Sequence, residues 1–400
     1  MVYPTRKRRF ATAIPIFSSR RGGAERYLVN LARDLIDKGY DVHIYAERWE
    51  EAMEGVSYHR VRTIPWPRSL RLLSFAWGAT QAMKKEDYDI TLGVGNSLEA
   101  HVLQPHGGVH WAWFWRSLRA YDQPVERFFK LWGRLLSPKQ WMSGWIEGAP
   151  YRRRKALKKV VAISEMVKQD MIRWYRLQDE AISVVYNGVD IERFHPRNRR
   201  WREEVRKRHG LGEAFVLLFV SNNFRMKGLG YLVRALAQLK DRYPGSIKLL
   251  VLGRDRSLPY RRLAERAGVG GDVVFAGSTT EIEKYYGASD LLVHPTFYDA
   301  CSLTVLEALA SGLPVVTTSR NGASGVLEQM QDGWILEDPA DVKSLSRAIE
   351  HFLNRTNHEM ACERARRKGE AFSEAFHFSR MRELFDRVIG GHEEERRRDE

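Results

Sequence analysis

The chain has 400 residues, of which 44% are hydrophobic, and this is enough for two domains of ordinary size. Its formal net charge of +15 favours a phosphorylated substrate, an anionic membrane surface or nucleic acid as a partner, without choosing among them. No stretch is apolar over the roughly 18 residues that a membrane span needs, and the two cysteines lack the spacing of a zinc site or a disulfide framework.

The beginning of the chain predicts a strand, a glycine-containing loop and a helix. An apolar run covers residues 10–17, Gly22 and Gly23 follow it, and apolar residues recur at helical spacing over residues 28–36. Residues 42–46 supply the next strand and complete a βαβ unit. The two glycines form either a tight turn only or a loop at which the backbone approaches a ligand.

A second candidate loop follows the strands that we predict over residues 89–95 and 100–104. It contains His106, which comes just after a strand end and beside two glycines that would let a substrate approach. We therefore single out His106 as a candidate site residue. The alternative is a histidine that only packs against its neighbours or caps a helix.

The segment over residues 109–150 is unusually rich in aromatic side chains, and these are interleaved with arginine and lysine. Such a mixture suits the surface of an anionic membrane, because indole rings favour the headgroup region and basic groups attract anionic lipid. A helical hairpin that packs its aromatic residues into the first domain is an equally good interpretation. Stacking of single-stranded nucleic acid is a third one.

We place a domain boundary near residue 190. Strands are predicted before it, over residues 160–164 and 182–186, and Ser164 is in position to cap the helix that follows the first of these. A polar, arginine-rich stretch then covers residues 197–208, as is usual between domains.

In the second domain, strand ends carry residues that suit a nucleotide. The loops after the strands predicted over residues 215–220, 247–253 and 273–277 contain, in chain order, Asn222, Arg225 and Lys227, then Gly253 and Arg254, then Ser278. Two cations in one loop would stabilise the charge of an anionic ligand such as a diphosphate. We expect the second and third loops to lie beside the same ligand.

The stretch over residues 291–325 reads as strand, loop, helix, strand and a further loop that opens another helix. Asp299 lies in the first loop, and Glu307 falls one turn into the helix. The two helix starts, at about 302–304 and 323–326, follow neighbouring parallel strands, where free N–H groups favour an anion such as a diphosphate. The alternative is that both carboxylates are merely exposed, one on a loop and one on a helix surface.

An acidic residue, seven others and Glu307, ahead of a helix that ends in Ala-Ser-Gly-Leu-Pro-Val, resembles the donor-site signature of retaining nucleotide-sugar glycosyltransferases of family 4. The family usually has Glu where this chain has Asp299, and Gly where it has Ser302. The Asn-Gly-Val-Asp sequence at residues 187–190 resembles the interdomain marker of this family, and the loop with Gly22 and Gly23 resembles its donor-diphosphate loop.

The second strong resemblance is the Lys227-Gly228 pair, which is similar to the phosphate clamp of the family. The early Arg of the clamp is replaced here by Asn222, so that Arg225 would supply the charge. Within the family, Asn-Phe-Arg-x-Lys-Gly, Phe-Tyr-Asp-x-Cys-Ser-Leu and Gln-Pro-His-Gly-Gly-Val-His look most like α-glucosyltransferases of the lipopolysaccharide core.

The resemblance implies an α/β fold of the GT-B type, with two Rossmann-like domains that face each other across a cleft. Residues 1–190 would form the acceptor-binding domain, onto which a C-terminal helix at about 373–391 packs back. Residues 191–372 would form the nucleotide-sugar-binding domain, and residues 392–400 a charged, disordered tail.

It also implies a site and a reaction, namely transfer of a hexose with retention at the anomeric carbon. Glu307 would bind the ribose hydroxyls, Asp299 and His106 the sugar hydroxyls, and Arg225 and Lys227 the diphosphate. The donor-binding residues would be Gly22, Gly23, Asn222, Gly253, Arg254, Ser278, Ser302, Leu303, Thr304 and Glu307. The donor is expected to be UDP-glucose, as a co-substrate, with no metal ion and no other cofactor.

The expected partners are the nucleotide sugar, an anionic lipid-linked glycan as acceptor, and the inner leaflet of the membrane as a peripheral contact, with no nucleic acid. The apolar run over residues 10–17 is too short for a signal peptide and is interrupted by Pro15, so we expect a cytoplasmic protein, peripheral to the inner membrane.

Three other functions stay open at this point. A nucleotide-sugar epimerase would share the architecture, because a fold does not fix a reaction. A dinucleotide oxidoreductase would need a G-x-G-x-x-G sequence after a strand, and we find none. A basic nucleic-acid-binding protein would bind DNA or RNA with a steep salt dependence and ignore nucleotide sugars.

Overall fold

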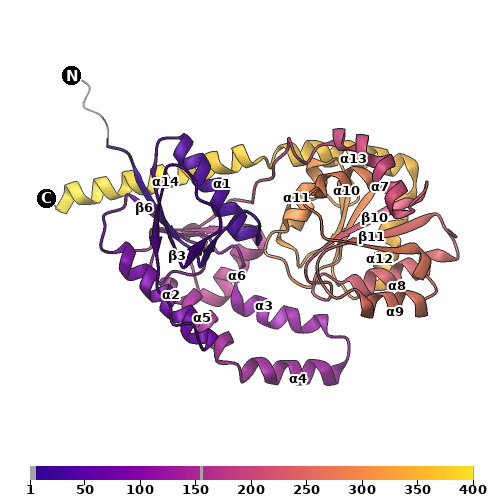
Figure 1. Cartoon of the computed structure of the whole chain (residues 1–400), viewed down its shortest axis with the longest axis horizontal. Helices are drawn as coiled ribbons and strands as arrows, with labels where there is room; N and C mark the ends of the chain where they lie inside the picture. Colours follow the sequence, from indigo (N-terminus) through magenta and orange to yellow (C-terminus); the bar gives the residue numbers. More distant parts are fainter. Residues whose placement is uncertain (1–5, 154–155, 400) are drawn as a thin grey trace. The chain divides into compact units, whose positions relative to one another are not determined.

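The computed structural model describes residues 6–153 and 156–399, and it divides into two compact units. Unit 1 consists of Met1–Phe114, Val125–Val185 and Phe378–Glu400, and unit 2 consists of Trp115–Pro124 and Tyr186–His377. Residues 1–5, 154–155 and 400, which belong to the expected first domain and tail, lie outside the described residues. Each unit is a β-sheet with helices against it (Figure 1).

Unit 1 is built on a seven-stranded parallel sheet with the strand order β5-β3-β1-β6-β7-β8-β9. Its strands are β1 Arg9–Ala13, β3 Asp41–Ala46, β5 Val56–Arg60, β6 Ile90–Gly93, β7 Val102–Leu103, β8 Lys159–Ala162 and β9 Ile182–Val184, and a separate pair is formed by β2 Ile16–Phe17 and β4 Arg48–Trp49. The strands predicted over residues 89–95, 100–104 and 182–186 are present, but each is shorter than its apolar run.

Most helices of unit 1 begin at or just after a glycine, serine or proline. The helices are α1 Gly23–Asp37, α2 Arg68–Met83, α3 His110–Arg116, α4 Pro124–Leu135, α5 Pro138–Arg153, α6 Glu165–Tyr175 and α14 Glu374–Asp399, with a 3₁₀ turn at η2 Asp179–Ala181. The 3₁₀ turn η1 Ser117–Ala120, which follows α3, belongs to unit 2. The prediction that Ser164 caps a helix is confirmed, since its Oγ accepts a hydrogen bond from the N–H of Val167 at 3.2 Å.

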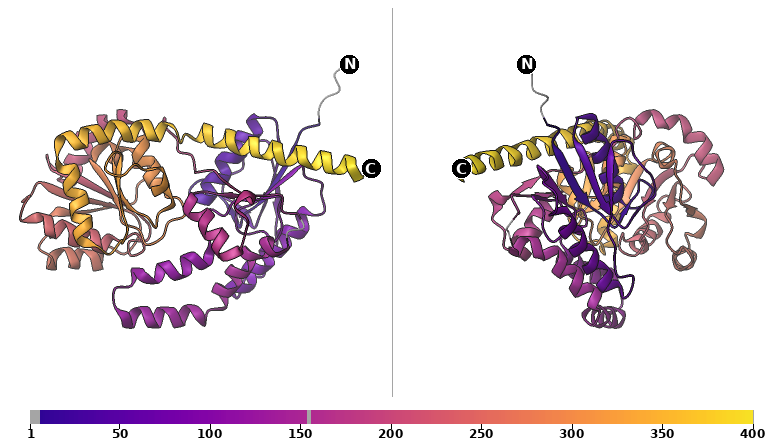
Figure 2. Two further views of the ribbon diagram at one scale, coloured as in Figure 1. Left: turned by 180° about the vertical axis from the view of Figure 1, so that it is seen from behind. Right: turned by 60° about the vertical axis from the view of Figure 1, so that its left-hand side comes forward.

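The core of unit 1 lies on both faces of the sheet, because alternate residues of a strand point to opposite sides. Phe10 of β1 packs with the leucines of α1 and with Phe385 of α14, whereas Ala11 and Ala13 pack with Phe75 of α2. The last helix therefore covers one face of the unit 1 sheet together with α1 (Figure 2). It continues to Asp399, so the expectation of a disordered tail from residue 392 is wrong.

Unit 2 is built on a six-stranded parallel sheet with the strand order β12-β11-β10-β13-β14-β15. Its strands are β10 Phe215–Val220, β11 Ile247–Leu252, β12 Val273–Gly277, β13 Leu291–His294, β14 Val315–Thr318 and β15 Gly333–Leu336. Its helices are α7 Arg202–His209, α8 Leu229–Lys240, α9 Leu258–Arg266, α10 Ile282–Ala288, α11 Leu303–Ala310, α12 Val342–Leu353 and α13 Arg355–Glu370, with 3₁₀ turns at η3 Pro196–Trp201, η4 Gly270–Asp272 and η5 Gly322–Val326.

The helix expected to start at about residues 323–326 is only a short 3₁₀ turn. The loop after β14 leads into η5, a 3₁₀ turn of five residues, and by Leu327 the chain is extended again. Two glycines among these five residues weaken any longer helix. Asn321 caps the turn, because its Oδ1 accepts a hydrogen bond from the N–H of Ala323 at 3.1 Å.

The order of strands in unit 2 creates a switch point between β10 and β13. From β10 the chain first moves outwards through β11 and β12, and then returns to β13 on the other side of β10. Loops after adjacent strands therefore diverge there, and ligands of open α/β sheets bind in the resulting crevice at the carboxyl ends of the strands. The predicted fold class, two Rossmann-like α/β domains, is confirmed. Within the described ranges, no helix has the length and apolar character needed to cross a membrane.

Candidate active site

The switch point of unit 2 is occupied by an ion pair. Lys227 comes from the loop after β10, Asp299 from the loop after β13, and the Lys227 Nζ lies 2.5 Å from the Asp299 Oδ2. The same Nζ donates to the carbonyl oxygen of Tyr298 at 3.2 Å. Both charged side chains are about one-fifth exposed, at 18% and 21%, so the pair is held by the fold yet open to a ligand.

Asp299 is an ionised carboxylate in a largely buried place. Burial alone would raise the pKa of Asp299, but the charge of Lys227 and the neighbouring His294 imidazole lower the pKa far below its ordinary value. His294, whose Nε2 is 3.5 Å from the Asp299 Oδ2, is fully buried, and burial lowers its pKa. In the sequence, the only indication of His294 as a site residue is its position at the end of β13.

The two loops approach each other so closely that the residue after Lys227 has to be a glycine. Gly228 has a φ of +78°, and a Cβ placed on it would lie 2.2 Å from the carbonyl oxygen of Pro295. Across the same contact, the N–H of Phe297 donates to the carbonyl oxygen of Met226 at 2.9 Å. This gives the Lys-Gly sequence its physical reason, because the glycine sets the position of the lysine beside Asp299.

Glu307 is buried on α11, with 5% of its surface exposed, and the Tyr286 hydroxyl donates to its Oε2 at 2.8 Å. The interpretation of Glu307 as a helix-surface carboxylate is therefore wrong. At the start of the same helix the hydroxyls of Ser302 and Thr304 lie 2.8 Å apart. The N–H of Val305 donates to the carbonyl oxygen of Ser302 at 3.2 Å, and N–H groups that precede it at such a helix start suit an anion.

Asn321 joins the loops after β13 and β14. Its Oδ1 accepts from the N–H of Ser302 at 3.3 Å, and the N–H of Gly322 donates to the carbonyl oxygen of Asp299 at 2.8 Å. The Asp299 N–H in turn donates to the carbonyl oxygen of Arg320 at 3.0 Å. The position of Asp299 thus depends on Asn321, whose structural role sequence reasoning missed.

The loops after β10, β11 and β12 also contact one another. The Asn222 Oδ1 accepts from the N–H of Arg254 at 3.1 Å, and the N–H of Gly253 donates to the carbonyl oxygen of Gly277 at 2.7 Å. Gly253 has a φ of +143°, and a Cβ on it would lie 1.6 Å from the carbonyl oxygen of Ser221. Ser278 follows Gly277 in an exposed position.

Arg225 lies in the same loop as Lys227 but contacts a different segment. Its guanidinium carbon is 4.6 Å from the ring centre of Tyr121, a residue of the Trp115–Pro124 segment of unit 2. The next residue, Asp122, binds the Tyr231 hydroxyl and also the Arg234 Nη2 of α8, the latter at 2.9 Å. Sequence reasoning assigned this segment to the aromatic region and missed its contact with the phosphate-clamp loop.

In unit 1, the structure brings the helix after the Gly22-Gly23 loop against His106. Gly22 precedes α1 with a φ of −87°, so neither it nor Gly23 has the left-handed conformation that requires glycine. The imidazole of His106, which follows β7, lies 4.1 Å from the ring centre of Tyr27 in α1. Both candidates lie at the carboxyl edge of the unit 1 sheet, within their own unit.

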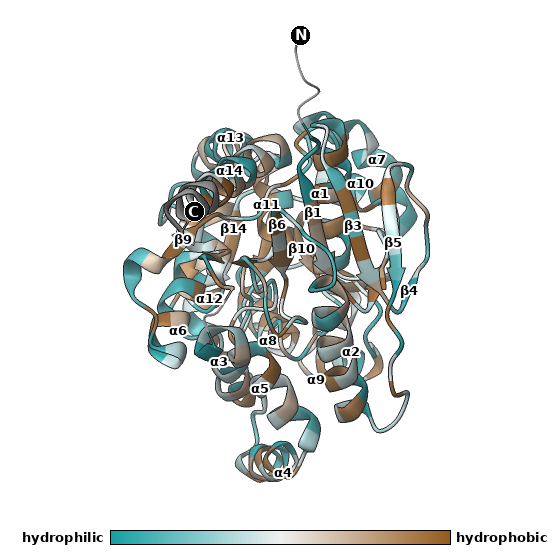
Figure 3. Cartoon of the chain, turned by 90° about the vertical axis from the view of Figure 1, so that its left-hand side faces the viewer, coloured by the Kyte–Doolittle hydropathy of each residue, from teal (hydrophilic) through white to brown (hydrophobic). Residues whose placement is uncertain are grey.

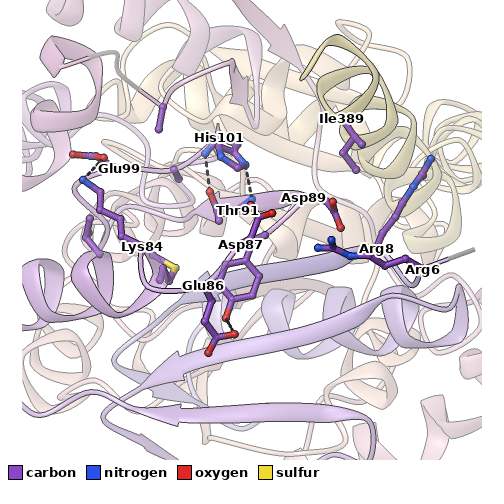
Figure 4. A pocket seen from close by; sticks show the side chains of 15 residues that line it. Arg6, Arg8, Lys84, Glu86, Asp87, Asp89, Thr91, Glu99, His101 and Ile389 are labelled. Atoms are coloured by element: carbon purple, nitrogen blue, oxygen red, sulfur yellow. Dashed lines mark hydrogen bonds and ion pairs between the residues drawn. The ribbon is translucent and has the colours of Figure 1, made fainter. Parts of the chain in front are cut away.

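A cavity of about 590 Å³ in unit 1 lies at the opposite edge, where the strands begin (Figure 4). Two of its lining residues, Lys84 and Glu99, form an ion pair at 2.6 Å, and His101 is bound to Thr91 through two hydrogen bonds. The polar groups of these side chains are already bound to each other. Ligands of parallel α/β sheets bind at the other edge, where the strands end. We therefore do not assign the active site to this cavity.

Comparison with known proteins agrees with this geometry. The model of the family described as Glycosyltransferase Family 4 matches residues 21–193, and that of Glycosyl transferases group 1 matches residues 202–369. The lipopolysaccharide glucosyltransferase WaaG of Escherichia coli (strain K12) is 24% identical over 346 residues, which cover 85% of this chain and 88% of that protein. D-inositol 3-phosphate glycosyltransferase 2 of Catenulispora acidiphila is 26% identical over 355 residues, with 80% of each protein covered.

Solved structures of similar fold cover almost the whole chain. A crystal structure of WaaG has a TM-score of 0.76 at 20% identity, over 94% of this chain and 99% of that chain. A crystal structure of Anabaena HepE in complex with UDP-glucose has a TM-score of 0.68 at 17% identity, over 94% and 99%. The two units therefore define a GT-B fold. The chain belongs to the glycosyltransferases of family 4, and it is a transferase.

Proposed function

We propose that this glycosyltransferase moves glucose from UDP-glucose, with retention at the anomeric carbon, to an anionic lipid-linked glycan such as a lipopolysaccharide core. The observation that carries the proposal is the Lys227–Asp299 ion pair at the switch point of unit 2, in front of the helix that carries the buried Glu307. A cation, a carboxylate and a helix start at this edge suit a diphosphate joined to a sugar.

Each residue has a distinct task in the proposed reaction. Lys227 and Arg225 neutralise the diphosphate and the charge that grows on it as the sugar leaves, so that no metal ion or other cofactor is required. Glu307, held by Tyr286, accepts hydrogen bonds from the ribose hydroxyls. Asp299, an ionised carboxylate, accepts hydrogen bonds from the sugar hydroxyls, and His106 is the residue of unit 1 proposed to bind them. The leaving phosphate helps to deprotonate the acceptor on the same face of the sugar, which gives retention.

The choice of donor and acceptor is supported by two relatives. HepE was solved with UDP-glucose, and WaaG is described as a lipopolysaccharide glucosyltransferase. The net charge of +15 of this chain suits an anionic acceptor.

The decisive experiment screens nucleotide sugars for their effect on the melting temperature of the protein. We expect UDP-glucose to stabilise it by about 2.7 kcal/mol at a hundredfold excess over Kd. Glu307→Ala should abolish this effect, whereas Arg355→Gln, at an exposed position of α13, should keep it. Stabilisation by none of the nucleotide sugars would contradict the proposal.

Product analysis then separates a transferase from an epimerase. A transferase consumes UDP-glucose in step with the acceptor and places the glucose in the α configuration, which NMR of the product reports. An isomerised nucleotide sugar formed without acceptor would instead indicate the epimerase.

We also propose that α4 contacts the inner leaflet of an anionic membrane from the cytoplasmic side. Its exposed apolar residues recur three or four positions apart and so share one face of the helix: Val125, Phe128, Phe129, Trp132 and, just after the helix end, Leu136. Figure 3 displays both hydrophobic and hydrophilic residues along α4. Exposed apolar residues beside Arg127 and Lys130 suit an anionic lipid surface.

A further inference from the structure

Two arginines of unit 2, Arg116 and Arg320, contact the loop that carries Asp299, and a third, Arg119, follows Arg116 by three residues in the chain. Arg116 and Arg119 belong to the Trp115–Pro124 segment, and Arg320 follows β14. The guanidinium carbon of Arg116 is 5.6 Å from the ring centre of Tyr298. Arg320 is joined to the same loop from the other side, because its carbonyl oxygen accepts from the N–H of Asp299 at 3.0 Å.

Arg320 lies in an environment that is unfavourable for a cation. Its Nε is buried and has no hydrogen-bond acceptor among the described residues. Burial lowers the pKa of Arg320, and the positive charges of Arg119 and Arg116 lower it further, although Asp338 and Glu337 act in the opposite direction.

These two carboxylates do not neutralise the group by direct contact. Over the described ranges, neither Arg119 nor Arg320 forms an ion pair. Placing like charges near each other and burying a donor without an acceptor both cost free energy. An anion that binds between the two guanidinium groups removes both costs at once. Guanidinium forks match the oxygens of phosphate in particular, through paired hydrogen bonds.

We propose that Arg119 and Arg320 form a subsite for a phosphoryl group of the acceptor, next to Asp299. This rests on the proposed glycosyl transfer, in which Lys227 and Arg225 hold the donor diphosphate and leave these two arginines for a second anion. A phosphate monoester carries two charges at neutral pH and so matches two guanidinium groups. The main chain of Arg320 binds that of Asp299, so the subsite adjoins the loop that would contact the transferred sugar, where an acceptor has to bind.

The test titrates inorganic phosphate into the full chain saturated with UDP, at constant ionic strength, with chloride as the reference anion. UDP fills the donor site, so that the melting temperature reports on a second anion site. We expect phosphate to stabilise the protein more than chloride does. Arg119→Gln and Arg320→Gln should each weaken phosphate binding at least about tenfold and leave UDP binding unchanged.

Arg355→Gln is the matched control, because it removes the same charge from an exposed position of the same unit. It should bind phosphate as the wild type does. Equal effects of phosphate and chloride on the wild type, or unchanged phosphate binding in both test variants, would overturn the subsite.

Two further measurements distinguish a lipid-binding site and a failure of the proposed function from the acceptor subsite. If phosphate has no effect but binding to phosphatidylglycerol vesicles falls in both test variants, the arginines bind lipid headgroups and the acceptor assignment is overturned. Failure of the proposed function looks different, because UDP then does not bind. In that case the same phosphate titration on Lys227→Ala without UDP still reports on Arg119 and Arg320.

Discussion

Lys227 and Asp299 are 72 residues apart in the chain and form a 2.5 Å ion pair because the strands before them, β10 and β13, are neighbours in the sheet. The pair joins the group proposed to hold the diphosphate to the group proposed to hold the sugar. A donor that binds both partners would have to replace this interaction with its own contacts.

The first prediction concerns removal of the cation. Lys227→Ala leaves the Asp299 carboxylate largely buried without its counter-charge, and we expect a loss of about 1–3 kcal/mol in the free energy of unfolding, measured in urea. UDP-glucose should no longer stabilise this variant. The double variant Lys227→Met/Asp299→Asn should regain stability without regaining donor binding. If the single variant is as stable as the wild type, the pair does not hold the two loops together.

The second prediction concerns the group that fixes Glu307. Tyr286→Phe removes the hydrogen bond to the Glu307 Oε2 while it keeps the ring that packs in the core. We expect KM for the nucleotide sugar to rise about tenfold, as for the loss of one hydrogen bond to a charged group, with a smaller change in kcat. Unaltered kinetics would mean that Glu307 keeps its position without Tyr286.

The third prediction concerns Gly253. An alanine here would take a φ of +143° and place its Cβ 1.6 Å from the Ser221 carbonyl oxygen, so we expect Gly253→Ala to destabilise the protein by about 3 kcal/mol. Gly271→Ala is the control, because a Cβ there meets no atom within 4 Å. Urea unfolding of both variants gives the comparison, and equal effects would contradict the close contact between these loops.

The fourth prediction is a pH dependence in unit 1. Burial raises the pKa of Glu147 to about 7, although Tyr175 and the N–H of His110 donate hydrogen bonds to the carboxylate. The folded state therefore holds this proton more tightly than the unfolded chain, whose glutamate titrates near pH 4.3. The contribution to stability is complete below that pH and is lost as the pH rises towards 7.

The measurement compares Glu147→Gln, which cannot ionise, with the wild type at pH 4 and pH 8. We expect the stability of the variant relative to the wild type to increase by about 3 kcal/mol between these two values. Glu359→Gln, at an exposed position of α13, should show no such increase. A constant difference across this range would mean that Glu147 is already ionised at pH 4.

The fifth prediction concerns the apolar face of α4. Phe129 and Trp132 are 69% and 49% exposed, so replacing both by serine should not cost folding stability. Binding to vesicles that contain phosphatidylglycerol should fall at least about tenfold, because each ring brings apolar area into the lipid interface. Trp77→Ser, an exposed tryptophan on α2, is the control. If the double variant binds vesicles as the wild type does, α4 is not the part of the protein that contacts the membrane.

The sequence predicts the elements of this fold well where the chemistry is local. The apolar run of β10, the Lys-Gly turn after it and the start of α11 can all be read from consecutive residues. The contacts of Tyr286 with Glu307 and of Arg225 with Tyr121 could not be predicted, because each joins distant segments through the packing of whole elements. The exposure of the aromatic residues in α4 could not be predicted either, since an apolar stripe has the same period whether it is buried or not.

The last helix has a consequence for how the protein is made. Phe378, Met381, Leu384 and Phe385 of α14 complete the core of unit 1, although the first strands of that core leave the ribosome more than three hundred residues earlier. The residues of unit 2 are all synthesised before Phe378, so this unit can finish folding first. Until α14 has been synthesised, the face of the unit 1 sheet that this helix covers remains open to solvent.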